Sequence, residues 1–181
     1  KPFYNSVIST FCHQLANGEK TKIIDDKKLD LLHAYDVANG IYQVVLVGRT
    51  GEQKLRGSPI SVVETRERLI SLSEDYFNNI VPDITDNLNC QLFNTFRSYL
   101  SDDYYPRSFV LHSDQRGMLY EAVKSRQSGL TFLSITRPDI TRGNHYHVNK
   151  FERFIVTNGK ARIRFRKIFT EDVLTFEVDG G

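Results

Sequence analysis

The chain has 181 residues, of which 40% are hydrophobic, and a formal net charge of +2 at pH 7. This length and composition allow one large or two small domains with a packed core. No run approaches the roughly 18 apolar residues of a membrane-spanning helix, and nothing at the N-terminus has the residue order of a signal peptide. We therefore expect a cytoplasmic protein that does not contact a membrane.

Charge is divided unevenly along the chain. Residues 1–107 carry twelve basic and fourteen acidic side chains, whereas residues 108–181 carry twelve basic and eight acidic ones. The positive excess of the second half suits a phosphorylated small molecule better than a nucleic acid, because nucleic-acid-binding proteins usually carry a denser basic stripe. We expect no nucleic-acid partner.

The first 60 residues have the pattern of alternating helices and short strands. Asn5 is a candidate N-cap for a helix that ends near Gly18. Strand-like runs follow at residues 22–24 and 29–33. Asp36 begins a second helix, whose apolar side chains are expected to face inward: Val37, Ile41, Val44 and Val45.

A third helix has the firmest start signal. Ser61 and Glu64 form a capping box, in which each side chain accepts a hydrogen bond from a free backbone N–H. The residues that follow place three apolar side chains on one helix face: Leu69, Ile70 and Leu72. Residues 74–107 then predict a connecting region that contains one apolar helix near residues 92–100.

From about Phe109 the apolar period changes to two, the period of β-strands. Strand candidates separated by Gly, Asn, Asp and Pro cover residues 130–136, 152–157, 161–169 and 173–178. Short strands in series indicate an antiparallel sheet or barrel. We therefore predict an α+β chain with two domains, an α/β part at residues 1–107 that includes a connecting helix, and a β part at residues 108–181.

Residues 160–166 alternate between apolar and basic side chains. Four cations share one face of the expected strand: Lys160, Arg162, Arg164 and Arg166. A solvated outer face explains this pattern, and contact with phosphate is the alternative.

The segment 144–159 holds three potential metal ligands. On a strand, side chains at positions i and i+2 share one face, so His145 and His147 are expected to point the same way, and Glu152 on the next strand can reach the same point. Two imidazoles and a carboxylate suit Zn²⁺, Mn²⁺ or Fe²⁺. The spacing predicts a site for a divalent metal or a polar sugar, and the alternative is two unrelated histidines and a solvated glutamate.

Two stretches of the second half resemble a known family. Residues 113–121 resemble the D-x-R-G-x-F-x-E signature of cupin-fold epimerases that act on nucleotide-linked 4-keto sugars, with Leu119 in place of the usual aromatic residue. Residues 142–152, followed by Gly159, match the first cupin motif, with Val148 where relatives often carry a third histidine. Together with its α/β first half, the chain resembles the bifunctional capsular-polysaccharide enzymes of UDP-N-acetyl-L-fucosamine synthesis, in which a short-chain dehydrogenase/reductase domain precedes a cupin.

The first half resembles the reductase domain of the same family. Residues 4–11 resemble the helix beyond its active-site Tyr-x-x-x-Lys, and residues 31–38 resemble a strand-to-helix segment. No Gly-rich dinucleotide fingerprint occurs in the sequence, so the resemblance implies that the NADPH site belongs to a part of the complete protein outside this chain. The expected fold is the C-terminal portion of an extended reductase domain followed by the first part of a cupin jelly-roll barrel.

The chain begins at Lys1 and stops at Gly181 soon after a strand-like run, so we expect an internal part of a longer protein. The second cupin motif, which supplies another histidine ligand in the family, would follow Gly181.

The resemblance implies roles for the three candidate ligands. His145, His147 and Glu152 are expected to bind a divalent ion, with Zn²⁺ as the first choice. Such an ion can stabilise the enolate that forms when the C3 proton of a 4-keto sugar is removed, or it can be purely structural. Alternatively, His147 is the general base, because imidazoles exchange protons near neutral pH. The roles of ligand and base are exclusive.

Two further residues of the family signature are candidate site residues. Arg116 is a candidate ligand of the substrate diphosphate, since a guanidinium pairs with two oxygens at once, and a surface pair with Asp114 is the alternative. Glu121 is a candidate catalytic carboxylate that contacts sugar or base, or else a solvated strand residue. His13 and His112 have no partner pattern, and no chemistry is assigned to them.

The resemblance therefore implies a nucleotide-sugar epimerase and reductase of capsular or surface polysaccharide precursor synthesis. The cupin would epimerise C3 of a UDP-linked 4-keto-6-deoxy-N-acetylhexosamine, and the reductase domain would reduce C4 with NADPH. The expected partners are the UDP-linked sugar and a second copy in a homodimer. The alternative is a non-catalytic cupin that binds sugar or metal, or mediates dimerisation, and is attached to a nucleotide-sugar reductase.

Overall fold

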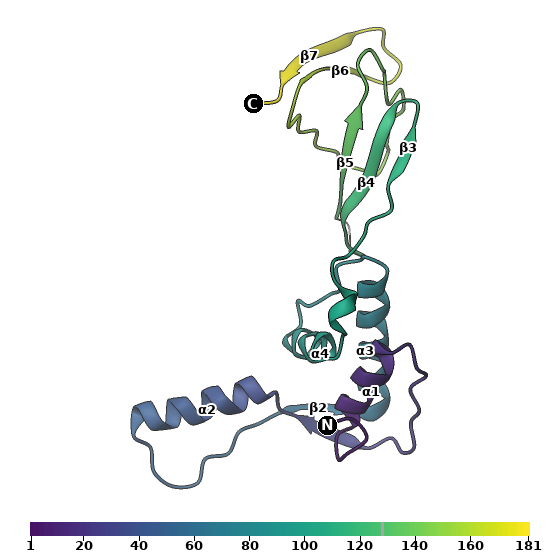
Figure 1. Cartoon of the computed structure of the whole chain (residues 1–181). Helices are drawn as coiled ribbons and strands as arrows, with labels where there is room; N and C mark the ends of the chain where they lie inside the picture. Colours follow the sequence, from purple (N-terminus) through teal and green to yellow (C-terminus); the bar gives the residue numbers. More distant parts are fainter. Residues whose placement is uncertain (128) are drawn as a thin grey trace. The chain divides into compact units, whose positions relative to one another are not determined.

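The structure is a computed structural model that describes residues 1–127 and 129–181. Its contacts divide the chain into two compact units, Lys1–Ile140 and Thr141–Gly181. Helices and small antiparallel sheets are both present, which confirms the predicted α+β class (Figure 1). This division is based on contacts in space and does not identify evolutionary domains. The expected domain boundary after residue 107 therefore stays a prediction.

Three helices form the core of the first unit. They are α1 (Val7–Ala16), α3 (Val62–Phe77) and α4 (Asn87–Arg97), and each contacts the other two (Figure 1). Their facing side chains form one buried apolar cluster: Phe11, Cys12, Val62, Leu69, Leu72, Leu92, Phe93 and Phe96. The predicted apolar helix near residues 92–100 is therefore confirmed, but it begins and ends earlier in the chain.

The helix starts follow local hydrogen-bonding chemistry. Ser61 caps α3 as predicted, because its hydroxyl accepts a hydrogen bond from the Glu64 N–H at 3.1 Å. The Glu64 carboxylate instead accepts from Arg68 at 2.9 Å, one turn later. The first helix is capped by Ser6 rather than Asn5, because Asn5 has a left-handed φ of 51° whereas Ser6 is extended and accepts from the Ser9 N–H.

A two-stranded sheet joins β1 (Lys28–Leu31) to β2 (Ser58–Ser61) in antiparallel register. The first strand begins one residue before the predicted run 29–33. In the part of the chain that the structure describes, residues 22–24 belong to no strand, so that prediction is wrong. A strand needs a partner for its backbone groups, and a short apolar run alone does not supply one.

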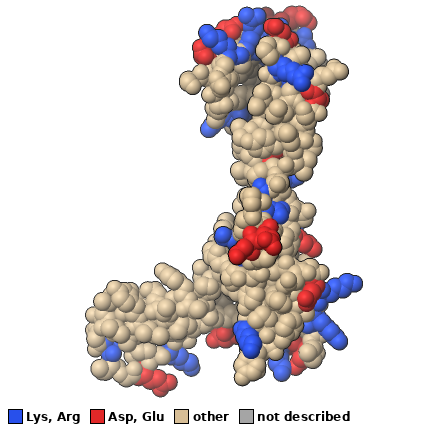
Figure 2. Space-filling model, viewed as in Figure 1, with Lys and Arg blue, Asp and Glu red and all other residues tan. Residues whose placement is uncertain are grey.

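The expectation that the second helix faces inward is also wrong. This helix, α2 (Ala34–Val47), begins two residues before Asp36 and contains no buried residue. Its apolar side chains are exposed, Val45 at 71% and Ile41 at 59%. Few charged side chains lie over α2 in the space-filling view (Figure 2). Periodicity identified the helix but not what covers its apolar face.

The rest of the first unit carries a three-stranded antiparallel sheet with the order β3 (His112–Asp114), β4 (Gly117–Lys124) and β5 (Leu130–Thr136). The bounds of β5 agree with the predicted strand. A short connector, η1 (Asp102–Tyr104), precedes this sheet. Strand β4 was not among the strand candidates, and its pairing with β5 is interrupted by a bulge between Glu121 and Val123.

Hydrogen bonds attach this sheet to the end of α3. The Val81 N–H donates to the Lys124 carbonyl at 2.7 Å. Asp75, whose side chain is 5% exposed, accepts a hydrogen bond from the Arg126 guanidinium at 2.5 Å. Helical core and sheet of the first unit are thus joined through a buried carboxylate.

The second unit contains one antiparallel hairpin, β6 (Lys160–Arg166) paired with β7 (Val173–Asp179). Both strands were predicted, but β6 begins one residue and ends three residues before the predicted run 161–169. Residues 152–157, which are all described, form no strand, so that candidate is wrong. The apolar residues of β6 pair with apolar residues of β7, and Ile163 opposite Phe176 is one such pair.

The four cations of β6 lie on the opposite, mostly solvated face of the hairpin. Lys160 and Arg162 pair with carboxylates of β7, Asp179 at 3.4 Å and Glu177 at 2.6 Å. Basic and acidic side chains are mixed over this end of the chain in Figure 2. These pairs support the solvated outer face among the two interpretations of this pattern. Among the residues that the structure describes, no helix combines the length and apolar content needed to cross a membrane.

Candidate metal centre

The residues before the histidine pair turn the chain sharply. Gly143 and Asn144 both have positive φ, 96° and 64°, and Asn is one of the few side chains that tolerates this region. Residues 141–152 form no strand, although all of them are described. The strand alternation from which convergence of His145 and His147 was predicted is therefore absent.

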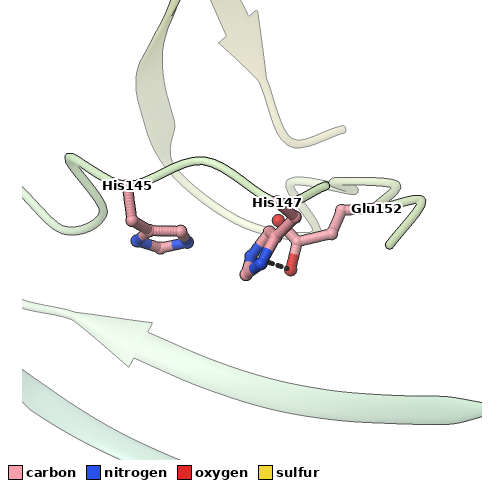
Figure 3. A group of neighbouring side chains, drawn as sticks. All are labelled: His145, His147 and Glu152. Atoms are coloured by element: carbon pink, nitrogen blue, oxygen red, sulfur yellow. Dashed lines mark ion pairs between the residues drawn. The ribbon is translucent and has the colours of Figure 1, made fainter. Parts of the chain in front are cut away.

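The three side chains nevertheless come together. One ligand atom each from His145, His147 and Glu152 lies within 4.8 Å of the others. The imidazole Nε2 of His147 is 3.4 Å from Oε1 of Glu152, and the two imidazole centroids are 4.8 Å apart at an angle of 65°. Figure 3 shows all three side chains on the same side of one loop, with His147 directed at Glu152.

The distance between the His147 and Glu152 ligand atoms fits a divalent cation of the zinc type. Bonds of roughly 2.1 Å in tetrahedral geometry place neighbouring ligand atoms about 3.4 Å apart, which is the separation of the His147 and Glu152 atoms. A side-chain rotation of the exposed His145 would be needed to bring its nitrogen to the same distance. Two nitrogens and one carboxylate oxygen are a zinc donor set, and three protein ligands leave a coordination position free.

Lys150 is a member of this cluster that the sequence patterns did not indicate. Its ammonium nitrogen lies 2.6 Å from Oε1 of Glu152, the oxygen that also faces His147. The hydrogen bond from Lys150 is the main cause that lowers the pKa of Glu152, and the charges of Lys150 and both histidines act in the same direction. The Lys-x-Glu spacing is the only signal that the sequence contains for this contact.

Arg116 lies on the turn between β3 and β4, in the first unit. Its guanidinium binds the Asp114 carboxylate at 2.6 Å, and its backbone N–H donates to the same carboxylate at 2.8 Å. The neighbouring carboxylate raises the pKa of the Arg116 guanidinium. The surface pair that was the alternative for Arg116 is thus present, and diphosphate contact stays a prediction.

Glu121 lies on β4 beside a small cavity of about 110 Å³ in the first unit. The cavity also takes in His112 on β3 and Lys124, whose ammonium is 3.5 Å from the Glu121 carboxylate. Sequence reasoning gave His112 no chemistry. The signal that places it here is the strand register, since His112 pairs with Leu119, two residues from Glu121 on the same face.

Comparisons with known proteins agree with the expected likeness in its coarser form. Residues 112–181 match the profile of a family described as "Polysaccharide biosynthesis C-terminal domain". The chain is 31% identical over 174 residues to the UDP-2-acetamido-2,6-beta-L-arabino-hexul-4-ose reductase of Pseudomonas aeruginosa. The match covers 94% of this chain and 47% of that reductase.

Solved structures of the capsular polysaccharide assembling protein CapF show the same fold. A CapF crystal structure from Staphylococcus aureus superposes with a TM-score of 0.85 at 28% identity, covering 99% of this chain and 54% of that one. CapF with the inhibitor 3-isopropenyl-tropolone gives a TM-score of 0.84 at 28% identity, with the same coverage. The chain therefore spans about half the length of these relatives.

Proposed function

We propose that this chain is part of a nucleotide-sugar-modifying enzyme of capsular or surface polysaccharide synthesis. The likeness to a UDP-sugar reductase along 94% of the chain and the CapF fold along 99% of it support this role. The observation that carries a more specific proposal is the convergence of His145, His147 and Glu152 within 4.8 Å. In our proposal these three side chains hold a divalent ion, for which Zn²⁺ is the first candidate.

A bound divalent ion supplies Lewis acidity toward a substrate oxygen. A purely structural ion is the alternative for the same three ligands.

The proposed reaction of the cupin part is epimerisation at C3 of a UDP-linked 4-keto-6-deoxy-N-acetylhexosamine. The C4 carbonyl acidifies the neighbouring C3 proton, so a base removes it and a proton returns from the opposite face. We assign His147 to the metal because its Nε2 is 3.4 Å from Oε1 of Glu152, a separation at which both atoms can bind one ion. Glu121, beside His112 in the cavity of the first unit, stays the candidate acid–base residue of the chain.

The second proposed activity belongs to the complete protein. The relative from Pseudomonas aeruginosa is named a reductase. By analogy, we propose NADPH-dependent reduction at C4 by a reductase domain, with its cofactor site outside these 181 residues. A homodimer and a cytoplasmic location complete this proposal.

Solvent exchange tests the epimerisation. Incubated in D₂O with the UDP-linked 4-keto sugar, the complete enzyme should incorporate deuterium at C3 before any reduction, and His145→Ala should slow this exchange by about a hundredfold or more. Glu171→Ala is the matched control, because Glu171 is exposed and lies outside the cluster. Exchange at the wild-type rate in His145→Ala would remove the metal centre from the reaction.

A non-catalytic sugar- or metal-binding module is the second candidate. It is favoured by the Lys150–Glu152 ion pair, which satisfies part of the cluster without any ion. The module predicts that the UDP-linked sugar binds and that no deuterium enters C3. A dimerisation module predicts neither binding nor exchange in this part of the protein.

A further inference from the structure

The Glu152 carboxylate already has a cationic partner. Lys150 reaches Oε1 of Glu152 at 2.6 Å, while His147 reaches the same oxygen at 3.4 Å. The contact is local, because only Phe151 separates the two residues in sequence. An ammonium thus lies on the oxygen that a metal shared with His147 would need.

The pair is accessible enough to exchange. The side chain of Lys150 is 46% exposed and that of Glu152 is 24% exposed. A pair of this kind contributes little stability, since both charges retain part of their hydration. The Lys150 ammonium can therefore leave the Glu152 carboxylate at a small cost in free energy. Because Lys150 is only two residues from Glu152 in the chain, its positive charge stays near the site.

We propose that Lys150 acts as a built-in competitor that weakens divalent-metal binding at His145, His147 and Glu152. This inference rests on the proposed metal centre. Lys150 occupies the Glu152 carboxylate while the site is free of metal, and it moves away when an ion binds. The tethered ammonium then repels the ion, and in water a unit charge held on the order of 5 Å from a divalent cation lowers its affinity about tenfold.

The affinity for Zn²⁺ of the 181-residue chain and its variants tests the proposal, measured by competition with a chromophoric chelator. Lys150→Met removes the charge but keeps an apolar stem, and we expect it to bind Zn²⁺ about tenfold more tightly than wild type. Lys150→Arg keeps the charge and should bind like wild type. Lys167→Met is the matched control, because Lys167 is exposed, lies in the same unit, and pairs with no carboxylate among the described residues.

Salt gives a second measurement of the same effect. At about 1 M ionic strength the screening length falls to roughly 3 Å, so the difference between wild type and Lys150→Met should shrink to less than about threefold. A packing effect of the methionine would persist at high salt.

Each outcome decides between the two levels of the proposal. Equal Zn²⁺ affinities of wild type and Lys150→Met, or weaker binding by Lys150→Met, would overturn the competitor role and leave the metal centre standing. Absence of Zn²⁺ binding by both would overturn the metal centre together with the competitor role.

Discussion

The helical core of the first unit and the segment that carries the candidate ligands are built on different principles. Among the residues that the structure describes, the nine buried hydrophobic ones all lie between Phe11 and Phe96. None of residues 141–181, all of which the structure describes, is buried. The core is therefore specified by packing, whereas the second unit depends on backbone pairing and, in our proposal, on an ion that joins three side chains. In our proposal, the packed core and the metal centre therefore lie in different units of the chain.

The largest expected effect is the loss of a core aromatic ring. Phe96 is fully buried and contacts the rings of Phe77 and Phe93. Phe96→Ala should lower the free energy of unfolding by about 3–5 kcal/mol, because transfer and cavity terms add. Phe169 is the matched control, since it is completely exposed in the second unit. Urea unfolding that ranks Phe169→Ala equal to Phe96→Ala would break the comparison between the two regions.

The next effect concerns the buried carboxylate that joins helix and sheet. Arg126→Met leaves Asp75 with 5% of its side chain exposed and no guanidinium partner. We expect a loss of about 1–3 kcal/mol, below the full penalty of a buried unpaired charge because Arg126 itself is half exposed.

The Asp75→Asn, Arg126→Met double variant is the control for this pair, because it removes the charge that is left unpaired. It should recover part of the lost stability. The reference is the sum of the stability losses of the two single variants. A double variant that loses more stability than this sum would show that the pair is not the link between helix and sheet.

A cap gives a smaller effect. Ser61→Ala removes the hydroxyl that accepts from the Glu64 N–H and should cost about 1 kcal/mol. Ser101 precedes the connector η1, and its hydroxyl makes no capping bond to any described residue. Measured by thermal unfolding, the stability of Ser101→Ala should therefore be close to that of wild type. An equal loss of stability in Ser61→Ala and Ser101→Ala would contradict the cap assignment.

The smallest effect concerns the two cysteine thiols and can be measured without a mutation. Burial raises the pKa of the Cys12 thiol to about 12, whereas Cys90 is only half-buried. At pH 8 a disulfide reagent should react with one thiol per native chain, at Cys90, because the thiolate is the nucleophile. Cys12 should react only as the core opens. Above pH 9, the ordinary thiol pKa, the unfolded chain releases the Cys12 proton, whereas the folded chain keeps it because burial raises that pKa to about 12. The free energy of unfolding should therefore fall as the pH rises from about 9 toward about 12.

Much of the fold follows from local patterns. Serine caps, apolar periods and turn residues located α3, β5, β6 and β7 within a few residues. Local patterns do not determine partners, which is why residues 22–24 form no strand and why Val45 of α2 is exposed. Strand β4 was missed because its bulge at Glu121 interrupts the alternation that marks a strand.

The candidate site was predicted from spacing, but for an incomplete physical reason. Strand alternation was expected to bring His145 and His147 together, and the structure brings them together on a loop whose turn begins at Gly143. Lys150 was missed because no motif assigns a role to that position. The contact depends on the path of the loop, which spacing alone does not define.

Metal content is the most direct test of the central claim. Equilibrium dialysis of the 181-residue chain against Zn²⁺, followed by elemental analysis, should give about one metal per chain. The His145→Ala, Glu152→Ala double variant should bind none, while a His112→Ala, Glu171→Ala control, which alters a histidine and a glutamate outside the cluster, should bind as wild type. Retention of one Zn²⁺ per chain in the His145→Ala, Glu152→Ala variant would contradict the assignment of the metal centre.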